Sequence, residues 1–225
     1  MGVFIAIIIM VLWLGHLIFS LFFVEFDLLN PLVYLHILIQ TYFYTGLFIT
    51  GHDAMHGVVA GNRKLNNFLG HLATTLFAFL SFKVLSKKHY SHHRFVTTEK
   101  DPDFSPRSNN FFVWWFIFMK NYTTWWQILF MAVAFNILLL WFSEAQLLAF
   151  WVAPAIISTM QLFLFGTYLP HRRPFTAEMK PHNSRSLKRN HLWAMLSCYF
   201  FGYHWEHHES PTTPWWKLYQ IKLKP

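Results

Sequence analysis

The chain has 225 residues, of which 55% are hydrophobic and only 12% are charged. This composition excludes an ordinary soluble protein and indicates a single integral-membrane domain over residues 1–225. A net charge of +8 would favour nucleic-acid binding in a soluble protein. Here the basic residues are gathered on one side of the predicted membrane topology, which explains the charge without nucleic acid. The one cysteine, Cys198, excludes an internal disulfide and a metal site built from thiolates.

Four apolar runs are long enough to cross the hydrocarbon core, which is about 30 Å thick and needs about 20 helical residues. The first run predicts an anchoring helix rather than a secretory signal, because no basic residue precedes it and no small-residue cleavage site follows it. A further run, residues 65–82, contains asparagine, histidine and threonine and predicts a re-entrant or interfacial helix. The four spans are expected at residues 2–24, 31–50, 122–142 and 147–168.

The segments between the spans are polar or interfacial. Residues 83–110 predict a loop with a helical stretch at 87–94, and the aromatic residues 111–120 are expected to lie along the membrane interface. A basic loop follows the fourth span from residue 170 to 190. The apolar stretch 192–203 is too short to cross the membrane.

The charges lie on one side of the predicted topology. The loops 25–30 and 143–146 contain acidic residues and no basic residue, whereas all 18 lysines and arginines lie within 63–120 and 172–224. Because basic residues accumulate in cytoplasmic loops, these segments and both termini are predicted to be cytoplasmic. The expected fold is an all-α membrane protein with about four transmembrane helices and a cytoplasmic cap.

Histidines are the most informative residues of the chain, which contains 14 of them. Nine lie at or just beyond the predicted cytoplasmic ends of the spans, in four separate stretches. Within three stretches the spacing is i, i+3 or i+4, which places imidazoles on one face of a helix. The nine are His52, His56, His89, His92, His93, His171, His204, His207 and His208.

This clustering predicts a metal site in the cytoplasmic cap. A single i, i+4 pair is more often structural, but two His-x-x-His-His runs in a short chain indicate metal binding. Nine imidazoles exceed what one metal uses, whereas two metals with four or five nitrogens each would use them all. Spacing alone leaves His171 equally open as a ligand or as part of a basic surface patch.

The other five histidines are expected to have ordinary roles. His16 and His36 lie inside spans and are expected to pack against polar partners. His71 lies in the run 65–82. His182 and His191 are expected to lie on the solvated surface.

Asp53, between two of the predicted ligands, is the acid chosen as the candidate catalytic residue. Its carboxylate would either accept an N–H bond from a ligating imidazole or cap the end of the helix, and both accounts stay open. Glu206 has the same ambiguity. Asp101 and Asp103 are more typical of turn formers.

At these residues the sequence resembles the membrane fatty acid desaturase and hydroxylase superfamily, whose members are non-haem di-iron enzymes with helical membrane bases. Within it, three motifs are similar to those of β-carotene ketolases, and so are the Asp-Pro-Asp-Phe turn at 101–104 and the Pro-Trp-Trp tail at 214–216. The motifs are GHDAMHG at 51–57, FGTYLPHR at 165–172 and FGYHWEHHE at 201–209.

The resemblance implies two iron ions cycling between Fe²⁺ and Fe³⁺, O2 as co-substrate, and His171 as a ligand. It implies 4-ketolation of a carotenoid drawn from the bilayer, by two hydroxylations of one ring carbon and loss of water. The basic cytoplasmic face suits an acidic electron donor such as ferredoxin. Aromatic residues, 20% of the chain, would face lipid or line a slot for the polyene.

Two classes of alternative share these features. A carotenoid ring hydroxylase or an acyl-lipid desaturase or hydroxylase would carry the same histidine motifs. A non-enzymatic metal-binding protein, such as a zinc transporter, would place polar ligands at the middle of the spans.

Overall fold

In the computed structural model, which describes residues 1–222, every regular element is a helix. The first half of the chain forms α1 (Gly2–Phe23), α2 (Pro31–Met55), α3 (Arg63–Ala78), α4 (Phe82–Phe95), α5 (Phe111–Tyr122) and α6 (Trp125–Leu138). A continuous rod of helix follows, made of α7 (Glu144–Leu147), η1 (Leu148–Val152), α8 (Ala153–Phe163), η2 (Leu164–Tyr168) and α9 (Leu169–His171). The remaining short helices are η3 (Ala177–Met179), α10 (His191–Cys198), α11 (His204–Glu209), η4 (Trp215–Lys217) and α12 (Leu218–Lys222).

Side-chain caps explain where most of the helices begin. Asn30 accepts a hydrogen bond from the Leu32 N–H, and Pro31 occupies the first turn of α2, where its missing N–H costs nothing. Asn, Ser or Thr likewise precedes α3, α4, α5, α6, α7 and α10 and accepts from a backbone N–H of the first turn. These capping residues are local signals, so the sequence itself specifies the helix starts.

Among the described residues, three helices are long and apolar enough to cross a membrane: α1, α2 and the rod Glu144–His171. They coincide with three of the four expected spans. The run expected at 122–142 is helical only over α6, because turns at residues 139–141 end the helix early. With 14 residues, α6 is about 21 Å long and shorter than the hydrocarbon core.

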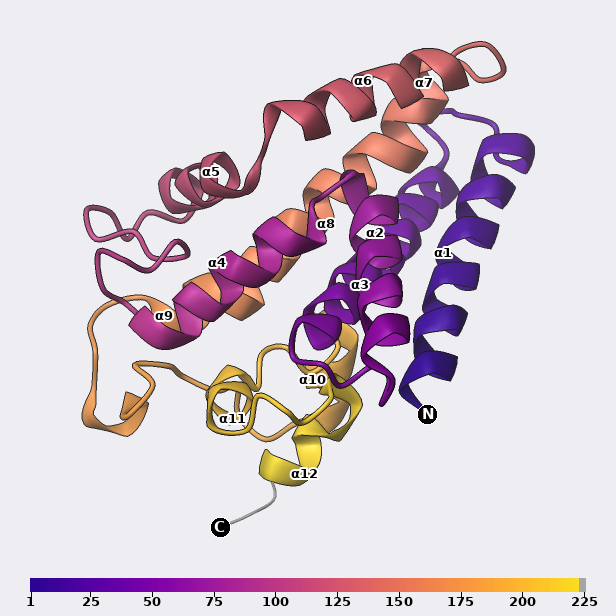
Figure 1. Ribbon diagram of the computed structural model, residues 1–225. Helices are drawn as coiled ribbons and strands as arrows, with labels where there is room; N and C mark the ends of the chain where they lie inside the picture. Colours follow the sequence, from indigo (N-terminus) through magenta and orange to yellow (C-terminus); the bar gives the residue numbers. More distant parts are fainter. Residues whose placement is uncertain (223–225) are drawn as a thin grey trace.

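Helices α3 and α4 form a bent pair with an angle of 100° between them. Phe79 takes a left-handed conformation with φ of 53°, and Ser81 caps the start of α4. Because α3 begins where α2 ends, and α4 returns to the end of α2 (Figure 1), the pair enters and leaves on the same side. This geometry agrees with the re-entrant helix predicted for 65–82, although α4 is longer than the expected stretch at 87–94.

Helix α2 is the centre of the bundle and packs against α1, α3 and α8. Trp13 of α1 meets Tyr44 edge to face with ring centroids 5.4 Å apart. On the α8 side, the Thr45 hydroxyl lies 2.5 Å from Oε1 of Gln161, whose amide in turn donates to the Ser197 carbonyl at 2.6 Å. Buried Cys198 is a packing residue in the same core, as expected.

The bundle has two different ends. The N-terminus and α10–α12 lie together at one end, which we call the cap end (Figure 1). The α1–α2 hairpin and the α6–α7 hairpin lie at the other end, where the Gln146 amide donates to the Leu21 carbonyl at 3.3 Å. These two hairpins carry Glu25, Asp27 and Glu144 and no lysine or arginine, so the charge asymmetry of the sequence is also an asymmetry of the fold.

Gly70 allows α3 to approach both α2 and α4 closely, since a Cβ there would meet the Phe82 ring and the Ala54 Cβ. We expect Gly70→Val to lower the free energy of unfolding by roughly 1–3 kcal/mol through overpacking. Thermal unfolding in detergent measures the loss. Gly61→Ala is the matched control, because a Cβ at Gly61 has open space, and an unchanged melting temperature for both variants would contradict the packing.

Candidate metal centre

Four segments bring the nine predicted histidines together at the cap end of the bundle. His52 and His56 end α2, and His89, His92 and His93 lie on α4. His171 ends α9, and the remaining three lie on α11. All nine predicted side chains therefore meet in one place, although the stretches are far apart in the sequence.

The imidazoles form two groups of four. The nitrogens of His52, His56, His89 and His207 lie within 4.8 Å of one another, and so do those of His92, His171, His204 and His208. His93 contacts both groups: its Nε2 lies 3.1 Å from that of His89 and 3.0 Å from that of His207, and its ring centroid lies 4.3 Å from that of His208. Two adjacent metal ions, each with at least four nitrogen donors, fit this arrangement.

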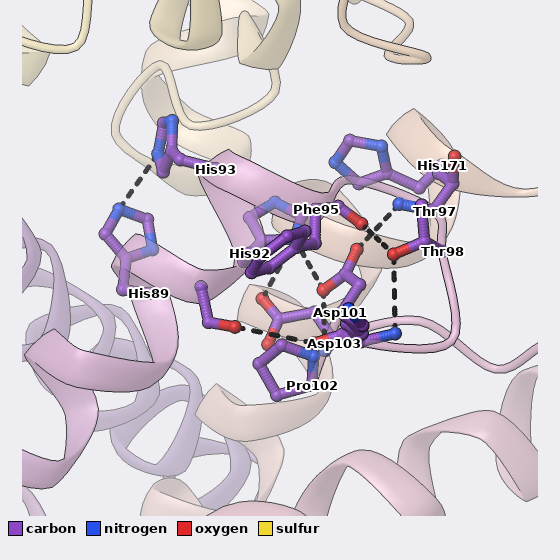
Figure 2. A network of polar contacts seen from close by, with 12 residues as sticks. His89, His92, His93, Phe95, Thr97, Thr98, Asp101, Pro102, Asp103 and His171 are labelled. Carbon is purple, nitrogen blue, oxygen red and sulfur yellow. Dashed lines mark hydrogen bonds and ion pairs between the residues drawn. The ribbon is translucent and has the colours of Figure 1, made fainter.

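Two of the ring nitrogens that point out of the cage have fixed partners. Nδ1 of His92 lies 2.9 Å from Oδ1 of Asp101, and Nδ1 of His171 lies 2.9 Å from the Asn183 carbonyl. Such acceptors hold the proton on Nδ1 and leave the Nε2 lone pair facing inward. Figure 2 shows His92 above the Asp101–Asp103 turn. His171 lies above and to the right of the turn in the same view.

Asp101 was expected to be a turn former. It has that role, and it also orients His92. Its carboxylate accepts the Thr97 N–H at 2.8 Å and the Asp103 N–H at 2.9 Å while it holds His92. It is 4% exposed. The one sequence signal was the Asp-Pro-Asp turn at 101–103, which begins eight residues after His93.

Asp103 belongs to the same turn and faces the cavity described below. The Tyr122 hydroxyl donates to Oδ1 of Asp103, and the Trp114 indole N–H donates to its backbone carbonyl at 2.7 Å. Burial raises the pKa of the Asp103 carboxyl to about 6, although the nearby His92 opposes this shift. The turn thus links α4 to α5.

Burial keeps most of the cage imidazoles neutral, whereas the pKa of His92 is raised because the carboxylates of Asp103 and Asp101 outweigh the effect of its burial. Burial lowers the pKa of His56 to about 4, and burial together with the neighbouring imidazoles lowers the pKa of each histidine of α11 well below the usual value. Nε2 of His52 and of His171 are buried without a hydrogen-bond partner among the described residues. Since buried polar atoms are rarely left unpaired, inward lone pairs without partners fit a metal-binding cage.

A π-helical turn sets the direction of His171. In η2 the Leu169 N–H bonds to the Leu164 carbonyl, which inserts one extra residue into the helix and rotates everything after it. Gly166 lies in this turn, and a Cβ there would occupy the place of the Phe201 ring. That ring packs 5.0 Å from His52 and 5.3 Å from His204.

Asp53 is buried, but its hydrogen bond is not to an imidazole. Oδ2 accepts the Trp215 N–H at 3.0 Å, whereas Oδ1 lies 3.6 Å from Nδ1 of His52, beyond hydrogen-bond range. Glu206 accepts from the Ser186 hydroxyl at 2.6 Å and pairs with Lys222 at 2.9 Å. Through these contacts, Asp53 and Glu206 connect separate segments of the cap.

The five other histidines lie outside the two groups. His16 bonds to Gln40 at 2.6 Å and to His36 at 3.1 Å between α1 and α2, as expected of intramembrane polar residues. His71 is exposed on α3. His191 lies 3.0 Å from the Tyr203 hydroxyl, and His182 bonds to Glu209 at 2.8 Å near the cage.

An apolar cavity of about 630 Å³ ends on the histidine cage. Its walls come from α2, α4, α6 and the rod, and most of its lining residues are aliphatic or aromatic. His52 and His89 of the first group line it together with His92 and His204 of the second. An apolar ligand in this cavity would contact both groups at once.

The chain belongs to the fatty acid desaturase family, which it matches over residues 29–125 and 116–225. Family membership and the two histidine groups together indicate a bound metal, iron.

Several named relatives are ketolases. A zeaxanthin 4-ketolase of Chlamydomonas reinhardtii is 45% identical over 182 residues, 79% of this chain and 41% of that protein. A β-carotene 4-ketolase of Protosiphon botryoides is 42% identical over 79% of this chain and 48% of its own length. The chain thus spans about half the length of these two relatives. A β-carotene ketolase of Paracoccus sp. (strain N81106 / MBIC 01143) is 36% identical over 94% of this chain and 88% of its own length.

We expect Asp101→Asn to weaken metal binding by roughly 10- to 100-fold, because the amide replaces the carboxylate that orients His92. Iron content per folded protein, measured after dialysis against a graded series of chelator concentrations, gives the change. Asp27→Asn, an exposed change at the opposite end, is the control. Equal iron retention in the two variants would remove the positioning role from Asp101.

Proposed function

We propose that the chain is a β-carotene 4-ketolase, an O2-dependent di-iron oxygenase that converts β-carotene to echinenone and canthaxanthin. The observation that carries the proposal is the apolar cavity that ends on histidines of both groups. The ketolase relatives support the substrate, since their similarity includes one protein matched over nearly its whole length.

The first group, His52, His56, His89 and His207, would hold one iron, and the second group the other. His93, between the groups, is placed to serve either ion. An iron pair held by neutral nitrogens supplies dioxygen activation and an oxidant able to remove hydrogen from carbon. Asp53 is a positioning residue in this scheme, because it fastens the Trp215 segment to the end of α2.

The chemistry at one ring balances as two successive hydroxylations. Each consumes one dioxygen, two electrons and two protons and releases one water, and the resulting geminal diol loses a third water to leave the ketone. The allylic C–H bond at C4 is weak, which favours attack there. Phe48, Phe77 and Phe201 line the cavity, so they exclude water while the ring is held beside the histidines.

The substrate would reach the cavity from within the bilayer. Ile128, Leu148 and Ile156 line the cavity and are also 61%, 45% and 48% exposed. Residues that face both the cavity and the lipid mark a lateral opening. With the basic segments at the cap end, the positive-inside rule supports a cytoplasmic metal centre and cytoplasmic termini.

Electrons would come from an acidic donor such as ferredoxin, docked on the basic cap surface. Arg172, Arg173 and Arg185 lie beside the cage on the segment that follows the rod. His182, with its side chain 22% exposed, has its ring 5.8 Å from that of His208 and bridges surface and cage.

Expression in bacteria that accumulate β-carotene tests the function. We expect chromatography with mass analysis to show echinenone and canthaxanthin, and His92→Ala or His204→Ala to lower ketone formation by more than about 100-fold through loss of a ligand. His71→Ala, an exposed histidine, is the matched control. Zeaxanthin as product would mean a ring hydroxylase, and altered acyl chains with unchanged β-carotene would mean a lipid substrate.

Ionic strength tests the donor. Raising it from about 0.01 M to about 0.15 M shortens the Debye length from roughly 30 Å to roughly 8 Å. We therefore expect the KM for ferredoxin to rise several-fold in membranes that contain the chain, with kcat nearly constant. A KM that does not depend on salt would refute electrostatic docking, and turnover driven by dithionite controls for salt effects on the enzyme.

A further inference from the structure

The cavity below the metal centre is long, and one face of the rod forms its full length. Lining residues recur every three or four positions, the spacing of a single helix face. They include Leu148, Val152, Ala155, Thr159, Leu162 and Gly166. At about 1.5 Å per residue this stripe covers roughly 25 Å, close to the ~30 Å thickness of the hydrocarbon core.

Helix α6 supplies the facing wall of this groove. Ile128, Met131 and Phe135 line it on successive turns, and α6 runs antiparallel to the rod because the chain reverses between them (Figure 1). None of the 14 residues of α6 is buried, so this wall is lightly packed. A ligand can therefore slide in beneath α6 without breaking a core.

The two ends of the groove differ. At the cap end, Gly166 and the Phe201 ring adjoin His52 and His204 of the metal centre. At the other end, Phe135 and Leu148 lie next to the hairpin that joins α6 to the rod, on the opposite side of the membrane. Only one end of a bound molecule can reach the histidines.

On the basis of the ketolase function, we propose that the carotenoid stands upright across the bilayer in this groove, so that one ring is oxidised in each binding event. The conjugated chain is rigid and cannot fold back. A cavity of about 630 Å³ that extends along this stripe suits one extended chain rather than a folded one. The molecule cannot turn end over end inside the groove.

The second ring is therefore oxidised only after the monoketone has left the groove and bound again in the reversed direction. In that orientation the new keto group lies near the hairpin at Ser143 and Glu144, where interfacial water can solvate it. Each binding event completes the balanced oxidation of one ring, and free monoketone is an obligatory intermediate.

Isotope dilution tests the proposal. Membranes containing the chain receive labelled β-carotene, reduced ferredoxin and a large excess of unlabelled echinenone. We expect labelled echinenone to form and labelled canthaxanthin to fall by the factor of the dilution. Labelled canthaxanthin that resists dilution would overturn upright binding with release, whereas absence of any labelled ketone would instead refute the ketolase function.

A plug at the far end gives a second test. Val152→Phe fills the groove away from the metals, so turnover of β-carotene should fall at least several-fold while a shortened, one-ringed apocarotenoid keeps its rate. Ile157→Phe on the same rod is the control, because Ile157 is 37% exposed and does not line the groove. Equal effects on the long and the short substrate in folded protein would contradict upright binding. If Val152→Phe does not fold, the isotope result decides.

Discussion

The structure depends on the convergence of nine imidazoles in one largely buried cage. Burying that many polar side chains is costly unless each finds a partner, and several Nε2 atoms face only one another or nothing. Metal ions satisfy these lone pairs, and four separate helix ends have to meet for the ligands to come together. Three features bring the ligands together: the bend between α3 and α4, the π-turn before His171 and the folded cap.

The loops of the cap direct the cage as much as the helices do. Asp101 fixes His92, and the Asn183 carbonyl fixes His171, while the Asn183 amide also bonds to the Thr97 hydroxyl at 3.0 Å. The two basic segments are therefore connected through the outward nitrogens of two proposed ligands.

On the side of α6 the bundle is lightly packed, in contrast to the rigid arrangement of the metal ligands. Helix α2 is enclosed by its neighbours, whereas α6 buries no residue and faces the apolar groove. A rigid centre keeps the metal ligands in place, and a lightly held wall admits a large, stiff molecule from the lipid.

The sequence by itself determined the membrane class, three full spans, the helix starts and all nine histidines of the cage, because hydrophobic length, capping residues and i, i+3 or i+4 spacing are local properties. It could not divide the histidines into two groups, and it treated Asp101 as a turn former and favoured an imidazole partner for Asp53 no more than a capping role. Those outcomes depend on contacts between segments such as Asp53 with Trp215, 162 positions apart. The early end of α6, the direction of His171 and the long groove are likewise decided only when the helices pack, since packing selects among conformations that local sequence leaves nearly equal in energy.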